Sequence, residues 1–75
     1  MAHLIWYNTF PMSDLTNREK FLKVYANLPI PVRDEVVFID KDKKPMSWNV
    51  CYIEVINNTE LGDTILKYLE SLGII

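Results

Sequence analysis

The sequence predicts a small α+β domain of two layers, in which a β-hairpin packs against two helices. Three observations support this class. Two stretches, toward either end of the 75-residue chain, carry apolar residues at helical spacing. Between them lie two stretches rich in β-branched and aromatic residues, separated by the charged turn DKDKKP. The expected order is helix, strand, strand, helix, with a further strand possible before the first helix.

The first helix is expected from Thr16 to about Leu28. Thr16 and Glu19 have the spacing of a capping box, in which the two residues satisfy each other's free amides. Apolar side chains then recur at helical spacing, at Phe21, Leu22, Tyr25 and Leu28. The two prolines of Leu28-Pro29-Ile30-Pro31 hold the residues before them in extended geometry, so the helix must end near Asn27.

The two central strands are expected over residues 35–39 and 46–56. Both are rich in residue types that favour strands. With residues 41–44 as the loop, Phe38 lies opposite Ser47 and Val36 opposite Asn49. Alternation along the long second strand then produces two apolar faces. One carries Trp48, Val50, Tyr52 and Ile56, and the other carries Cys51, Ile53 and Val55.

The last helix is expected after Asn57, from the apolar stripe Leu61, Ile65, Leu69 and Leu72. Gly73 follows this stripe, and with Ile74 it fits a Schellman-type close. Residues 1–12 are predicted to be an N-terminal extension or an edge strand, because the apolar stretch LIWY at residues 4–7 is stopped by Phe10-Pro11. The single α+β domain then occupies residues 13–75.

Size and composition predict that this domain binds another protein. A chain of this length buries only about 60% of its unfolded surface, and its single cysteine excludes an internal disulfide. The helices can cover one apolar face of the hairpin, which leaves the other face and the overhanging end of the second strand to be covered. The cover would come from residues 4–7, from a second chain or from another protein. The candidate interface is Trp6, Trp48, Val50, Tyr52 and Ile56.

No set of side chains favours catalysis, so we predict a non-enzymatic protein without a metal or cofactor. A thiol nucleophile needs a base nearby, whereas the only histidine, His3, lies outside the predicted core. Cys51 is therefore predicted to be a buried packing residue. Asp40 and Asp42 alternate as in some metal loops, but the glycine and the final glutamate of a calcium loop do not follow them.

The alternative function is a small nucleic-acid-associated regulator of the antitoxin type. Lys41, Lys43 and Lys44 would contact phosphates from the turn, and Trp48 would stack on a base. The first helix would extend this surface with Arg18, Lys20 and Lys23. The formal net charge of −2 argues against binding to nucleic acid in general. A homodimer, or a complex with another protein, is therefore the favoured prediction.

A cytoplasmic location without membrane contact is expected. No apolar run approaches the roughly 18–20 residues that span a bilayer, and the amino end lacks the basic region of a signal peptide. A lone cysteine suits a reducing compartment.

Overall fold

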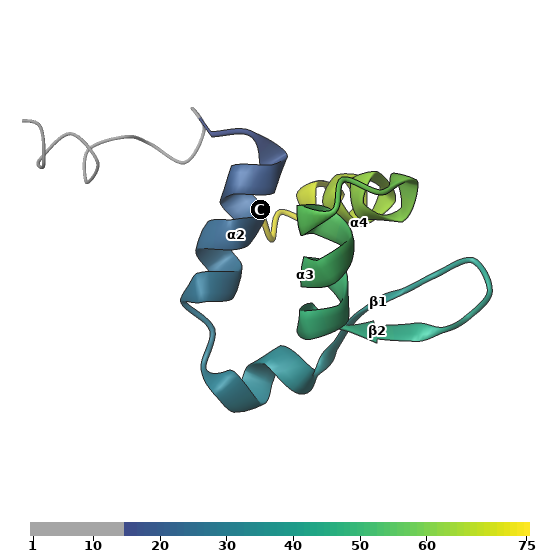
Figure 1. Cartoon of the computed structure of the whole chain (residues 1–75), viewed down its shortest axis with the longest axis horizontal. Helices are drawn as coiled ribbons and strands as arrows, with labels where there is room; N and C mark the ends of the chain where they lie inside the picture. The colour runs from purple at the N-terminus through teal and green to yellow at the C-terminus, as the bar shows by residue number, and fades with distance from the viewer. Residues whose placement is uncertain (1–14) are drawn as a thin grey trace, which may run out of the picture.

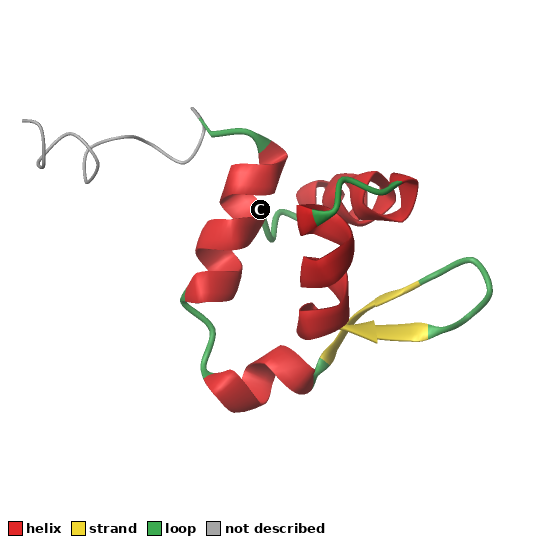
Figure 2. Ribbon diagram, viewed as in Figure 1, coloured by secondary structure: helices red, strands yellow, loops and turns green. Residues whose placement is uncertain are grey.

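The computed structural model of this chain describes residues 15–75. Its elements are helix α2 (Asn17–Ala26), the 3-10 helix η2 (Ile30–Asp34), strands β1 (Val36–Ile39) and β2 (Pro45–Ser47), and helices α3 (Trp48–Ile56) and α4 (Glu60–Ser71). α2 and α3 stand side by side, and the β1–β2 hairpin projects on the side away from α2 (Figure 1). The predicted class, a small α+β domain with a hairpin and helices, is confirmed (Figure 2). The possible N-terminal strand in residues 1–12 lies outside the described residues.

Helix α2 begins at the predicted capping box. The Glu19 amide donates to Thr16 Oγ1 at 3.2 Å, and the Thr16 amide donates to Glu19 Oε1 at 2.9 Å. These two bonds satisfy amides that have no partner inside the helix. The guanidinium of Arg18 donates to the carbonyl oxygens of Val55 and Ile56, at 3.4 and 3.3 Å. The start of α2 is thereby attached to the end of α3.

The predicted second strand is wrong beyond Ser47, because residues 48–56 form helix α3. Ser47 Oγ accepts a hydrogen bond from the Val50 amide at 3.2 Å and caps this helix. The side chains buried along α3 are Trp48, Cys51 and Val55, at spacings of three and four. Residues 48–56 have the composition of a strand, but burial of this helical stripe outweighs the strand propensity. A helix therefore follows the second strand directly, and the predicted order lacked it.

The hairpin register also differs from the prediction. Val36 pairs with Ser47, Phe38 with Met46 and Ile39 with Pro45. The cause lies in the turn, where Asp40 Oδ1 accepts from the amides of Asp42 and Lys44, at 2.7 and 3.1 Å. The Asp40 amide also donates to Lys44 O at 3.1 Å, so the loop holds one residue fewer than predicted.

A bulge between Val36 and Phe38 interrupts β1. Phe38 is buried and Val37 packs against the core, whereas Val36 and Ile39 are both exposed. Without the extra residue, a strict period of two would have placed Val37 and Ile39 on one face. The bulge therefore directs two consecutive side chains inward and the residue on either side of them outward.

The core is shared by helices α2, α3 and α4 and by both strands. Its buried side chains are Phe21, Phe38, Met46, Trp48, Cys51, Val55, Ile65 and Leu69. The ring of Phe21 lies 5.8 Å from that of Trp48, and the rings of Tyr25 and Tyr52 stack at 4.4 Å. The prediction that Cys51 packs inside the domain is confirmed, since its side chain is fully buried.

Helix α4 carries the predicted stripe at Leu61, Ile65 and Leu69, whereas Leu72, its fourth predicted member, follows the helix and is 54% exposed. The helix ends as predicted. Its cap is Thr59, two residues after the predicted start, and Thr59 Oγ1 accepts from the Gly62 amide at 2.9 Å. Gly73 adopts a φ of 75°, and the Ile74 amide donates to Leu69 O at 3.0 Å, which is the Schellman bond. Within residues 15–75, no helix is both long and apolar enough to cross a membrane.

Candidate interaction surface

The residues of the predicted interface do not share a face in the structure. Trp48 is only 8% exposed and belongs to the core, and Tyr52 is half-buried against Tyr25. Val50 lies on the outer side of α3 with 43% of its surface exposed. Ile56 is half-buried at the end of α3, and Trp6 lies outside the described residues. Because residues 48–56 are helical, a period of two cannot place these side chains on one surface.

The lysines of the alternative nucleic-acid surface are exposed on the hairpin turn, but their predicted partners lie elsewhere. Lys41, Lys43 and Lys44 are all exposed. Trp48 faces the core and is not available to stack on a base. Helix α2, with its basic residues, stands at the opposite side of the molecule from the turn (Figure 1). The structure therefore does not bring the three parts of this predicted surface together.

Cys51 is held as a neutral thiol. Its burial raises the pKa to about 11, and the negative charge of Glu54 contributes in the same direction. A thiol with a raised pKa and no exposed surface is a poor nucleophile at neutral pH. Its geometry is that of a core residue and offers no reaction site.

A chain of polar contacts joins α2, α3 and η2 beside the core. The Tyr25 hydroxyl donates to Asn49 Oδ1 at 2.5 Å, and Asn49 Nδ2 donates to Asp34 Oδ1 at 2.8 Å. The Arg33 guanidinium lies over the Tyr25 ring, 4.5 Å from its centroid. Tyr25 comes from α2, Asn49 from α3 and both Arg33 and Asp34 from η2, so these contacts fix how η2 sits against the two helices. The carboxylate of Asp34 thus serves as a hydrogen-bond acceptor that holds the fold together.

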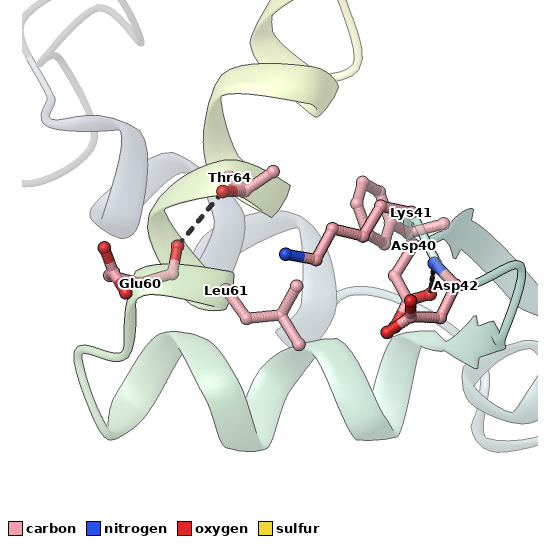
Figure 3. Close-up of a pocket in the computed structure, with 7 residues that line it drawn as sticks. Asp40, Lys41, Asp42, Glu60, Leu61 and Thr64 are labelled. Atoms are coloured by element: carbon pink, nitrogen blue, oxygen red, sulfur yellow. Dashed lines mark hydrogen bonds between the residues drawn. The ribbon is translucent and has the colours of Figure 1, made fainter.

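A pocket of about 430 Å³ lies between the hairpin turn and the start of α4. Phe38 and Leu61 form its apolar part, and Asp40, Asp42 and Glu60 place carboxylates around it. Figure 3 shows the Lys41 side chain extending across this pocket toward α4. Asp40 is engaged by the turn amides. Among residues 15–75, no three histidine, cysteine or acidic side chains are grouped so as to hold a metal ion.

The most exposed apolar side chains beside the sheet form one surface, which we call the edge surface: Val36, Ile39, Tyr68 and Leu72. They are 56%, 62%, 42% and 54% exposed. A hollow of about 230 Å³ is lined by the four residues of β1 and by Tyr68. The Tyr68 ring packs edge-on against Phe38 at 5.2 Å. Leu72 lies one helical turn beyond Tyr68, on the same side of α4.

The free edge of β1 runs along this surface. The sheet of the described residues has only two strands, so β1 has a strand neighbour on one side only. The Asp40 amide points toward β2, where it donates to Lys44 O. The backbone groups of Ile39, one residue earlier, therefore point to the free edge. β1 carries no charged residue, whereas β2 begins with Pro45, a residue that blunts a strand edge.

The sequence predicted the β1 strand but not this surface. It placed the exposed apolar edge at the end of the second strand, a segment that is helical in the structure. The bulge that turns Val36 and Ile39 outward contains no glycine, a residue that often marks a bulge in a sequence. A signal for Tyr68 was present, because it flanks the buried stripe of α4.

Comparison of the chain with protein-family models, with curated proteins and with solved structures gave no significant match. Its function is therefore inferred from the geometry of the residues themselves.

Proposed function

We propose that this protein is a non-enzymatic protein-binding module that associates with a second copy of itself through the free edge of β1. The observation that carries the proposal is the uncharged, apolar edge of β1 beside the exposed Tyr68 ring. A strand added there would gain main-chain hydrogen bonds from β1, and its side chains would cover the edge surface. This form of binding needs neither a cofactor nor a metal.

The size of the edge surface predicts modest affinity. Complete burial of one such side chain stabilises by about 1.5–3 kcal/mol, so burying the exposed half contributes about 1 kcal/mol. Four side chains on each of two copies then give roughly 8 kcal/mol before hydrogen bonds. Association itself costs at least about 4 kcal/mol, which leaves at most about 4 kcal/mol, a dissociation constant of about 1 mM, and the main-chain hydrogen bonds would tighten it further.

A reducing compartment suits a buried, unpaired cysteine, so we propose a cytoplasmic location. Nucleic-acid binding through the turn lysines is the weaker candidate, because the buried Trp48 removes its stacking residue. It predicts binding that weakens steeply with salt and is lost when Lys41, Lys43 and Lys44 are neutralised together.

The proposed function is tested by measuring the solution mass of the full chain by light scattering after size exclusion, from roughly 1 μM to 1 mM. The test variant is Ile39→Lys, which places a charge on the β1 edge. The matched control is Val50→Lys, another exposed apolar position, on α3. Circular dichroism and thermal unfolding verify that both variants remain folded.

We expect the wild type and Val50→Lys to dimerise as concentration rises, and Ile39→Lys to stay monomeric. A wild type that is monomeric throughout, or a dimer unaffected by Ile39→Lys, would show that the edge surface is not the interface.

A further inference from the structure

The free edge of β1 suits a partner strand that is short, apolar and uncharged. β1 has four residues, and none of them is charged. The hollow of about 230 Å³ beside it is lined by these four residues and by Tyr68. The backbone groups of Ile39 point to this edge, so the partner must offer free amides and carbonyls of its own, as an extended segment does.

A second copy of β1 suits this edge poorly. Glu35 precedes β1 and Asp40 follows it. In an antiparallel pair of two β1 strands, the start of one lies beside the end of the other, so Glu35 of one copy would approach Asp40 of the second at both ends. Like charges at such cross-strand positions destabilise a sheet. The bulge between Val36 and Phe38 also interrupts the regular alternation that such a pair would need.

Residues 4–7, Leu-Ile-Trp-Tyr, suit the edge better. They match β1 in length, and residues 1–13 contain no aspartate, glutamate, lysine or arginine. No register therefore sets a charged side chain of this segment against Glu35 or Asp40. In an extended strand, Leu4 and Trp6 lie on one side and Ile5 and Tyr7 on the other. Whichever side covers the hollow thus brings one aliphatic and one aromatic side chain to it.

Resting on the proposed function, we propose that the strand added to β1 is residues 4–7 of the second copy, and that each chain lends this segment to the other. The hairpin projects on the side away from α2, and the described chain begins at Leu15, just before α2 (Figure 1). To reach its own β1, the segment would have to pass around the helices. Fully extended, residues 8–14 span up to about 25 Å, a reach that allows the segment to leave its own molecule.

The exchange is isologous, since each copy gives and receives the same segment, and it covers both edges at once. Each copy adds four apolar side chains to the interface, Trp6 and Tyr7 among them. Tryptophan and tyrosine are the residue types that most often dominate binding between proteins. The exchanged dimer is therefore tighter than a contact between two edge surfaces alone.

The first test is the solution mass of a full-chain double variant, Ile5→Lys with Trp6→Lys, which places a charge on each side of the segment. We expect its dimerisation to weaken at least about tenfold, because an interface tryptophan is lost and charges meet an apolar edge. The matched control, Thr9→Lys with Met12→Lys, adds the same charge outside residues 4–7 and should dimerise like the wild type. Circular dichroism verifies that both variants remain folded.

The second test identifies which molecule supplies the segment. Isotope-filtered NMR on a mixture of labelled and unlabelled wild-type chains records only contacts between two molecules. We expect intermolecular cross-peaks from the Trp6 indole to the side chains of Ile39 or Tyr68. Trp6 contacts confined to a single molecule would overturn the exchange.

A dimer that Ile39→Lys disrupts, but that the double variant leaves intact, would overturn this inference and leave the proposed function standing. A monomeric wild type, or a dimer insensitive to Ile39→Lys, would remove the proposed function and this inference together.

Discussion

Gly62 lies directly against the backbone of Glu54, at the place where α4 packs on the end of α3. A Cβ atom on residue 62 would stand 2.5 Å from the Glu54 carbonyl oxygen and 2.9 Å from its carbon. Real Cβ atoms essentially never approach a backbone atom so closely. The two helices can be this near only because residue 62 has no side chain.

We therefore expect Gly62→Ala to destabilise the domain, although alanine is the better helix former. Helix propensity would return about 1 kcal/mol, whereas overpacking a tight contact costs about 1–3 kcal/mol, and backbone cannot move aside like a flexible side chain. Chemical denaturation measures the difference. Lys67→Ala, on the exposed side of the same helix, is the control and should change little. A more stable Gly62→Ala protein would show that the helices can separate without cost.

Ser47 is the residue at which strand becomes helix, and its cap is expected to contribute measurably. Ser47→Ala removes the hydroxyl that accepts from the Val50 amide, at an expected loss of about 1 kcal/mol. Ser47→Asp keeps an acceptor and adds a charge that suits a helix start, so it should retain stability. Thermal unfolding of the three proteins side by side provides the measurement. If the alanine and aspartate variants were equally stable, the Ser47 cap would contribute nothing to the stability of the domain.

Trp48→Ala is expected to unfold the domain rather than to separate two folded copies. Removing a buried tryptophan costs about 3–5 kcal/mol, which is a large part of the roughly 4–11 kcal/mol that a domain of this length possesses. Near-ultraviolet circular dichroism and the melting temperature report the loss. Val50→Ala, at an exposed position two residues further along, should melt close to the wild type. A folded Trp48→Ala protein with unchanged melting temperature would contradict its place in the core.

Cys51 is expected to make the protein less stable in alkali. The pKa of its thiol is raised in the folded state, from an ordinary value of 9.0 to about 11. Folding therefore favours the neutral thiol, and this contribution is complete below pH 9 and is lost as pH rises through 11. The expected loss is on the order of 1–2 kcal/mol.

The measurement is the free energy of unfolding against pH for the wild type and for Cys51→Ala. The tyrosines and lysines are common to both proteins, so the difference between the two curves isolates the thiol. Parallel curves from neutral pH to about pH 11 would mean that the thiol ionises as easily in the folded state as in the unfolded state.

Sequence alone predicted the elements whose signals are local. The capping box of Thr16 and Glu19 and the Schellman close at Gly73 depend on residues within one turn of each other, and both are present. The stripe of α4 was equally clear because its apolar residues repeat at a single helical period.

The segment 48–56 could not be assigned from its composition, because apolar residues occupy both its period-two and its helical positions. Two signals for a helix were present, namely Ser47 as a cap and the Trp48, Cys51 and Val55 spacing. What decides between them is the surface offered by Phe21, Ile65 and Leu69, which come from distant parts of the chain. The predicted interface failed to form one face for the same reason, since a side chain's direction depends on the period of its backbone.

The bulge in β1 also affects how this protein could diversify. Val37 and Phe38 turn inward together, while Val36 and Ile39 turn outward. Core packing and surface exposure therefore belong to different positions of the strand. If β1 binds a partner as proposed, substitutions at 36 and 39 would alter what the strand recognises without touching the packed interior. A designer could therefore vary these two positions in a library to obtain pairs of chains that bind one another selectively, with the same scaffold beneath each.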